Sequence, residues 1–303
     1  MKSNQFPILT AAIGLTLLLA SAAAQTPPPG AGGVPGGLPV MPVDHSFDDL
    51  VPPPSGVAPP GAAIVTARQF PPLPPNAPLP SPDPHNLDGA WVHEQPLAFM
   101  LDHDVYGQMP PYNPRGHKLL ARRLLSLKLS TPYINASSTC RPAGLPWQQD
   151  LNMPFMIFQS KDRIEVLYQE YHGRQTIYLN PADAPKTPSY LGTSIGHWDG
   201  DTLVVVTTNM KQPIWIDVDG TPASAKAVIT QRIRKIYEGH WSLQIETTLD
   251  DPTYYTHPWT WVHSYAWRPE RHVFTEYDCE TQIGDKSNDA NAGLIPEPPE
   301  DQN

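Results

Sequence analysis

The sequence predicts a mostly β protein, an antiparallel barrel of about eight strands preceded by an N-terminal helix. From residue 155 onward, β-branched and aromatic runs alternate with short turns, and no helix intervenes. In residues 241–249, apolar and polar side chains alternate, as expected for a sheet with one apolar face. Short turns without crossover helices favour a closed antiparallel barrel over a parallel sheet. A β-sandwich is the alternative, because period and turn length do not separate the two.

The expected strands follow one another through the second half of the chain. Asp199-Gly200 tolerates positive φ angles and predicts the tight turn of a hairpin. The β-branched run that follows this turn predicts a strand. The last two strands are expected to pair across Pro269-Glu270. The full set is 155–159, 164–169, 175–179, 202–208, 227–237, 241–249, 259–267 and 272–279.

The chain before these strands is mixed. Residues 87–91 predict a short opening strand or turn, and residues 114–128 predict a helix. Pro114 is tolerated in the first turn of this helix, and four leucines gather on one face. Arg122 and Arg123 are expected to face water on the opposite side.

The N-terminus has the pattern of a secretory signal peptide, residues 1–24. Lys2 is positively charged, residues 6–20 are apolar, and small residues up to Ala24 form a cleavage site. The apolar run is shorter than the roughly 20 residues of a membrane span, and no other candidate span follows. We therefore expect a bacterial protein that is periplasmic or secreted after cleavage near Ala24.

Composition divides the rest of the chain. Residues 25–86 are rich in Pro and Gly, and we expect a disordered linker there. Such a proline-rich linker also offers a binding segment for a cell-envelope partner. Residues 87–284 form the expected barrel domain, and residues 285–303 an acidic, disordered tail.

Cys140 and Cys279 are the two cysteines of the chain. In an exported protein they are expected to form a disulfide. Neither has a neighbouring Cys-x-x-Cys or His that would favour metal binding or nucleophilic chemistry.

Residues 192–208 read Gly-Thr-Ser-Ile-Gly-His-Trp-Asp-Gly-Asp-Thr-Leu-Val-Val-Val-Thr-Thr. With Cys140-x-Pro-x-Gly, Asp219-Gly-x-Pro-x-Ser and Glu276-Tyr-x-Cys, this stretch resembles the Gly-His-Ser-Ile-Gly-x-Trp-x-Gly-Asp-Thr-Leu-Val-Val signature of a large uncharacterised family of secreted bacterial proteins. The resemblance covers about residues 111–280 and implies a lipocalin-like β-barrel.

The chain departs from that resemblance at four polar positions. Thr193 and Ala223 stand where His is expected, Val206 where Asp is expected, and Gln231 where Glu is expected. If those groups form a family active site, this chain has lost it or changed its chemistry.

One strand carries an aromatic row. Trp259, Trp261, His263 and Tyr265 occupy alternate positions and so share one face. They are candidate ligand-binding residues, because large aromatics give a stiff surface for a flat or apolar ligand. Arg232, on the expected strand 227–237, is a further candidate, since its charge suits a carboxylated ligand. The alternative is core filling, which is common in barrels of about eight strands.

A second candidate set is ionic. His197 lies within the 192–208 stretch, Glu246 on the polar face of a strand, and Arg174 beside a turn. His197 and Glu246 are candidate acid and base, and Arg174 is a candidate to stabilise negative charge. The alternative is a set of cross-strand pairs on a wet face.

No metal or cofactor pattern stands out. His93-Glu94 and His103-Asp104 have no compact metal-ligand spacing, and the sequence indicates no organic cofactor. A net charge of −10 at pH 7, with no basic cluster interleaved with aromatics, argues against nucleic acid.

The leading functional hypothesis is an exported barrel that binds a small apolar or aromatic molecule. The alternatives are a cofactor-independent lyase, isomerase or hydrolase with acid-base residues in the barrel, and a structural cell-envelope protein. Whether the protein is an enzyme stays open at this point.

Overall fold

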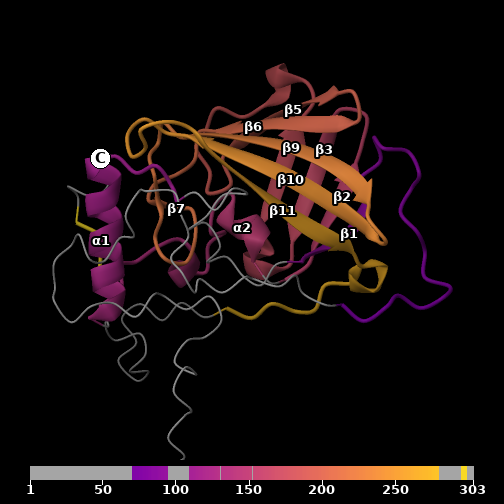
Figure 1. Cartoon of the computed structure of the whole chain (residues 1–303), viewed down its shortest axis with the longest axis horizontal. Coiled ribbons are helices and arrows are strands. Elements are labelled where there is room, and N and C mark those ends of the chain that lie inside the picture. The colour runs from indigo at the N-terminus through magenta and orange to yellow at the C-terminus, as the bar shows by residue number, and fades with distance from the viewer. Residues whose placement is uncertain (1–69, 95–108, 130, 152, 280–294, 299–303) are drawn as a thin grey trace, which may run out of the picture. The chain divides into compact units, whose positions relative to one another are not determined.

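The computed structural model describes residues 70–94, 109–129, 131–151, 153–279 and 295–298 (Figure 1). The expected signal peptide, residues 25–69 of the expected linker, and His103-Asp104 lie outside these residues. Within the described part of the chain, no helix is both long and apolar enough to span a membrane.

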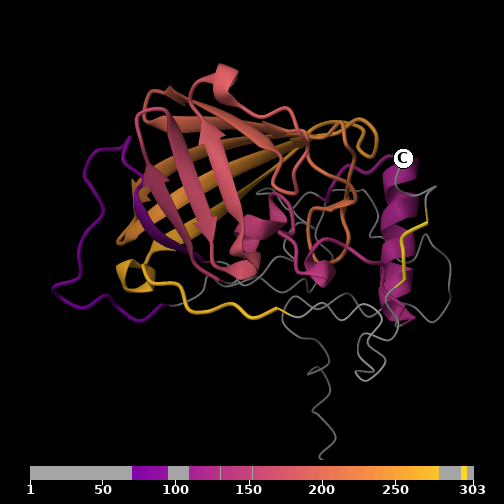
Figure 2. The same cartoon turned by 180° about the vertical axis from the view of Figure 1, so that it is seen from behind.

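The predicted barrel is confirmed, and it closes with nine strands in the order β1-β11-β10-β9-β6-β5-β4-β3-β2. Figures 1 and 2 show its opposite sides. The strands are β1 (Gly89–His93), β2 (Phe155–Gln159), β3 (Arg163–Tyr168), β4 (Arg174–Tyr178), β5 (Thr193–Asp199), β6 (Thr202–Thr208), β9 (Val228–Tyr237), β10 (Trp241–Asp250) and β11 (Trp259–Trp267).

One pair of neighbours, β4 and β5, is parallel, and the other neighbours are antiparallel. This follows from the odd strand number, since directions that alternate around a closed ring must match once. The connection 179–192 carries the chain back so that β5 starts in the same direction as β4. The expected hairpin at Asp199-Gly200 is present, with Gly200 at φ +54°.

The expected strand at 272–279 is wrong, because these residues have no strand structure. The chain instead turns through the 3₁₀ helix Pro269–Arg271 after β11. β1 pairs with the edge of β11 that this strand was expected to occupy, with Trp91 opposite Trp267. Both edges of β11 are therefore paired, one with β1 and one with β10.

The barrel interior holds the main apolar core. On β10, Leu243, Ile245, Thr247 and Leu249 are buried, whereas Glu246 is exposed, which confirms the predicted alternation. Gly196 on β5 gives the interior room, since a Cβ there would lie 2.6 Å from Cγ2 of Ile177. Each strand thus contributes its inward side chains to one continuous cluster.

The predicted helix is α1 (Pro114–Lys128), and Asn113 caps it by accepting hydrogen bonds from the amides of Arg115 and Gly116. Arg123 was expected to face water, but this prediction is wrong because the residue is buried, at 2% exposure. Its guanidinium donates to the carbonyl of Gly220 at 2.8 Å, in the loop between β7 (Ile214–Trp215) and β8 (Pro222–Ala223). It also pairs with Glu297.

Both ends of the expected domain extend further than composition indicates. Residues 70–86, which we call the arm, lie against the barrel: Trp267 Nε1 donates to the carbonyl of Pro78 at 2.9 Å. The ammonium of Lys235 donates to the carbonyls of Asp83 and Asn86, each at 2.7 Å. The described part of the expected tail, 295–298, packs as well, because Glu297 is 3% exposed.

The predicted disulfide between Cys140 and Cys279 is confirmed, with 5.8 Å between the Cα atoms. It joins the segment that precedes the barrel strands to the segment that follows β11. The pairing is therefore as expected, although Cys279 lies in a segment that is not a strand.

Candidate functional site

The short helix α2 (Trp147–Asp150) carries polar side chains into the barrel core. Gln148, Gln149 and Asp150 are all at most 4% exposed. Gln148 anchors the helix, because its carbonyl accepts from the amide of Ala143 and its amide donates to the carbonyl of Glu170, each at 2.9 Å. Asp150 is thereby placed opposite the inward face of β11.

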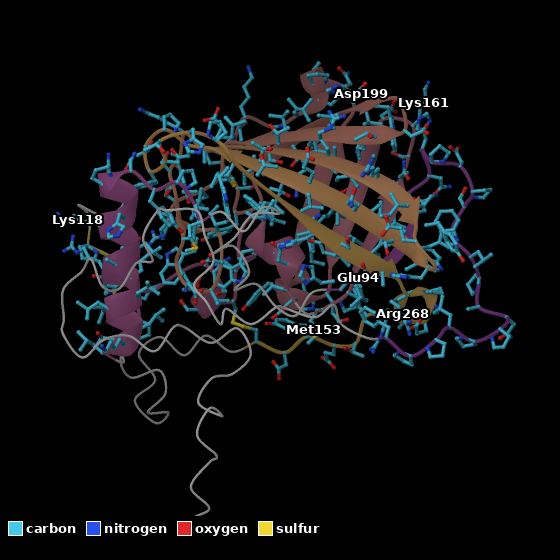
Figure 3. The ribbon with its side chains drawn as sticks, in the orientation of Figure 1. Glu94, Lys118, Met153, Lys161, Asp199 and Arg268 are labelled. Atoms are coloured by element: carbon cyan, nitrogen blue, oxygen red, sulfur yellow. A yellow bond between two sulfur atoms is a disulfide. The ribbon has the colours of Figure 1, made fainter. Side chains whose placement is uncertain are left out.

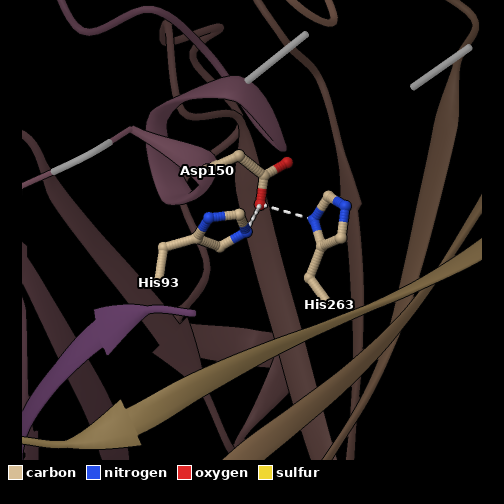
Figure 4. Close-up of side chains that lie close together, drawn as sticks. All are labelled: His93, Asp150 and His263. Carbon is tan, nitrogen blue, oxygen red and sulfur yellow. Dashed lines mark hydrogen bonds and ion pairs between the residues drawn. The ribbon is translucent and has the colours of Figure 1, made fainter. Parts of the chain in front are cut away.

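Asp150 is the centre of a buried cluster that we call the His-Asp-His centre, formed by His93, Asp150 and His263 (Figure 4). Oδ1 of Asp150 lies 2.9 Å from Nδ1 of His263 and 3.8 Å from Nε2 of His93. The hydroxyl of Tyr265 donates to the same oxygen at 2.5 Å. The side chains of His93, Asp150 and His263 are 1%, 3% and 8% exposed, so bulk water does not screen them.

The surroundings of Asp150 favour its charged form. Burial alone raises the pKa of this carboxyl, but the charge and hydrogen bond of His263, the charge of His93 and the hydrogen bond from Tyr265 together lower it below its ordinary value. Burial, with Asp150 beside it, raises the pKa of Tyr265 well above its ordinary value. The centre therefore holds a carboxylate with a protonated phenol as donor.

Two further hydrogen-bond networks cross the interior. Nε2 of Gln231 donates to Gln149 at 2.7 Å and to Thr247 at 3.3 Å. The hydroxyl of Tyr168 donates to Gln175 at 2.8 Å. That network continues from Gln175 to Ser194, 3.0 Å, and on to Thr207, 2.8 Å. These contacts satisfy groups that would otherwise be costly to bury.

The aromatic row of β11 is packed into the core. Trp259 and Trp261 are 3% and 2% exposed, and their ring centroids are 4.7 Å apart. Among the described residues, neither indole N–H has a hydrogen-bond partner. The row therefore fills the barrel, as the core-filling alternative requires, and leaves two donors inside it.

A cleft of about 670 Å³ lies between the arm and the barrel. Its apolar lining comes from the arm and from the end of β11, and includes Pro74, Ala77, Pro78, Leu79, Pro80 and Trp267. Asp88 and Glu270 also line it. Its volume is within the range of about 300–1,000 Å³ that is typical of small-molecule sites.

Four of the five candidate ligand-binding residues converge inside the barrel: Trp259, Trp261, His263 and Tyr265. Arg232 does not, because it lies on the outer face of β9 and pairs with Asp199 at 3.2 Å. Figure 3 labels Asp199 at the outside of the barrel.

The candidate acid-base residues do not come together. His197 and Glu246 are both exposed on the outer face, in one transverse row with Val204 and Arg232 between them. Three strand spacings therefore separate them, about 14 Å. Arg174 is exposed and forms a two-bond pair with Glu165, each bond 2.9 Å. This agrees with the cross-strand alternative.

The four departures from the family pattern are dispersed as well. Gln231 points inward and is 1% exposed, whereas Val206 is 37% exposed on the outer face. Thr193 donates to the carbonyl of Pro185, and Ala223 is buried on β8. These positions do not define one pocket.

Sequence reasoning missed His93 and Asp150 as partners of His263. His93 was considered only beside Glu94, and Glu94 contacts His240 and Ser242 instead. Asp150 and His263 are 113 residues apart, so no local spacing connects them. The only usable signal was His263 on an inward-facing aromatic row.

Comparison with known proteins adds no family assignment: no protein-family model, no curated protein and no solved structure matches this chain.

Proposed function

We propose that this protein is an exported β-barrel that binds a small apolar or aromatic molecule in the cleft between the arm and the barrel. The observation that carries the proposal is the cleft itself, about 670 Å³ with a mainly apolar lining. The aromatic row named from the sequence is packed in the core, so the ligand site moves from Trp261 to the surface around Trp267.

The lining also indicates the charge of the ligand. Among the residues that the structure describes, Asp88 and Glu270 are the acidic residues of the cleft, and no Lys or Arg lines it. Arg268 lies next in the chain, but its guanidinium pairs with Glu270 at 2.6 Å. The charge of Glu270 is therefore compensated, whereas Asp88 has no Lys or Arg beside it in the described lining, so an anionic ligand is disfavoured and we propose a neutral one.

The experiment compares two exposed leucines. Leu79 lines the cleft and is 72% exposed, whereas Leu129 is the C-cap residue of α1 and is 58% exposed. Leu79→Ser should weaken binding of neutral aromatic probes such as naphthalene or indole by about tenfold at most, the loss of one partly buried apolar contact. Leu129→Ser should leave binding unchanged.

Binding is measured by native mass spectrometry and by titration of tryptophan fluorescence. Ala77→Trp provides a second variant that fills the cleft with a bulky ring. The proposed site would be refuted if the parent protein bound none of the neutral probes. It would also be refuted if the Ala77→Trp variant bound them as well as the parent does.

Export is part of the same proposal. The disulfide between Cys140 and Cys279 supports it, because such bonds persist in oxidising compartments. Expression in a bacterial host followed by fractionation and N-terminal mass analysis tests it. We expect a mature chain that starts near Gln25 outside the cytoplasm, and an unprocessed cytoplasmic chain would contradict it.

Catalysis is a second candidate, supported by the hydrogen bond between Asp150 and His263. A carboxylate that orients an imidazole is the arrangement of a general base. A screen of esters and activated carbon acids, with His263→Gln as comparison, tests it. Turnover that is equal in both proteins would exclude this residue as the base.

A further inference from the structure

We propose that His93, Asp150 and His263 bind one divalent transition-metal ion inside the barrel. The three side chains come from three separate elements, β1, α2 and β11. Figure 4 shows the two imidazoles directed at the same carboxylate oxygen. The site is separate from the cleft, and the proposal does not depend on ligand binding there.

The distances fit a metal site. One ligand atom from each residue lies within 4.8 Å of the other two. Metal–ligand bonds of about 2.0–2.2 Å place neighbouring ligand atoms about 3.0–3.5 Å apart. The observed separations of 2.9 Å and 3.8 Å from Oδ1 of Asp150 lie on either side of this range. All three separations are at most 4.8 Å, so closing the shell takes side-chain shifts on the order of 1 Å.

The donor set selects the class of ion. Two imidazole nitrogens and one carboxylate oxygen suit Zn²⁺, Fe²⁺ or Co²⁺, and leave at least one coordination position open. Ca²⁺ and Mg²⁺ prefer oxygen donors and fit this set poorly. A metal ion would replace the protons on the two imidazoles and supply positive charge to the buried carboxylate, which bulk water does not stabilise.

A supporting shell holds the carboxylate in place. Tyr265 donates to Oδ1 of Asp150. Gln149, the residue before Asp150, accepts from Gln231 on β9, and Gln148 anchors the same helix. Such outer contacts fix ligand orientation in metal sites, and their loss typically weakens metal binding about 10–100-fold.

The test uses the full mature protein, stripped with a chelator and then titrated with Zn²⁺ or Co²⁺ by calorimetry. We expect one ion per chain. His93→Gln and Asp150→Asn should each weaken binding by at least about 100-fold, and Tyr265→Phe by about 10–100-fold. His197→Gln is the matched control, since His197 is exposed on β5, and it should bind like the parent.

A measurement on the parent alone covers the case in which the variants fail to fold. With Co²⁺ bound, proton NMR should show hyperfine-shifted ring signals from two histidines, together with visible ligand-field absorption. A folded, stripped parent that binds neither ion at micromolar concentration would overturn the proposal. Binding that is unchanged in His93→Gln and Asp150→Asn, or a Co²⁺ spectrum without two shifted histidines, would overturn it too.

Discussion

Replacing Glu297 by Ala tests whether the C-terminal segment holds α1 against the barrel domain. Arg123 and Glu297 form a two-bond ion pair, 2.6 Å and 3.1 Å, with side chains 2% and 1% exposed. Removing one partner of a buried pair costs about 3–5 kcal/mol, because the remaining charge stays buried without compensation. Arg123 would keep the carbonyl of Gly220 and the face of Trp215, so we expect the lower end, about 3 kcal/mol.

Urea denaturation followed by circular dichroism measures the loss. Asp199→Asn is the matched control, because it removes a carboxylate charge from the pair with Arg232, whose two side chains are 61% and 44% exposed, and exposed pairs contribute about 0–1 kcal/mol. Arg123→Met with Glu297→Leu should recover most of the loss, since apolar replacement removes both charges. A cost below about 1 kcal/mol for Glu297→Ala would refute the idea that residues 295–298 clamp the helix.

Three further predictions address the core, the pH dependence and the arm. Trp261→Ala should lower the free energy of unfolding by about 3–5 kcal/mol in thermal melts, because the ring is 2% exposed, and a much smaller loss would mean the interior is hollow there. Burial raises the pKa of Asp217 from 3.8 to about 6, although hydrogen bonds from Thr221, Asp219 and Gly220 oppose this shift. Between these two pH values the folded state therefore holds a proton that the unfolded state has released. The stability that this group adds below pH 4 is lost as pH rises to about 6. Because Asn does not titrate, the stability of Asp217→Asn should gain about 3 kcal/mol relative to the parent across that window. Parallel pH profiles of the two proteins would contradict this. A chain that starts at Leu87 should be about 2–4 kcal/mol less stable than one that starts at Phe70, because Lys235 and Trp267 lose carbonyl acceptors in the arm, and equal stabilities would show that the arm contributes nothing.

Much of the barrel could be predicted because its signals are local. The side chains of β10 alternate between core and solvent with a period of two, and this period is visible in the sequence of 241–249. Asp199-Gly200 marks a hairpin because few residues tolerate its backbone angles. Pro114, after the Asn113 cap, starts a helix for an equally local reason.

The closure of the barrel, in contrast, could not be predicted from local signals. β11 takes β1 as its second neighbour, although Trp91 and Trp267 are far apart in sequence and the adjacent run 272–279 has strand-like residues. Both segments have the composition of a strand, so propensity alone cannot choose between them. Long-range packing and hydrogen bonding decide, and Pro269 helps by turning the chain away after β11.

By itself, the sequence determined which residues of 241–249 and of the aromatic row face inward, where the chain turns at Asp199-Gly200, and that Cys140 and Cys279 would meet. Only the tertiary structure decided which inward residues share a site. His93 and Asp150 reach His263 because β1 closes the ring beside β11 and α2 enters the core. His197 and Glu246 stay apart because three strand spacings separate them on the outer face. Local periodicity assigns a side chain to a face, whereas its neighbours on that face depend on strand order and register, which no local pattern contains.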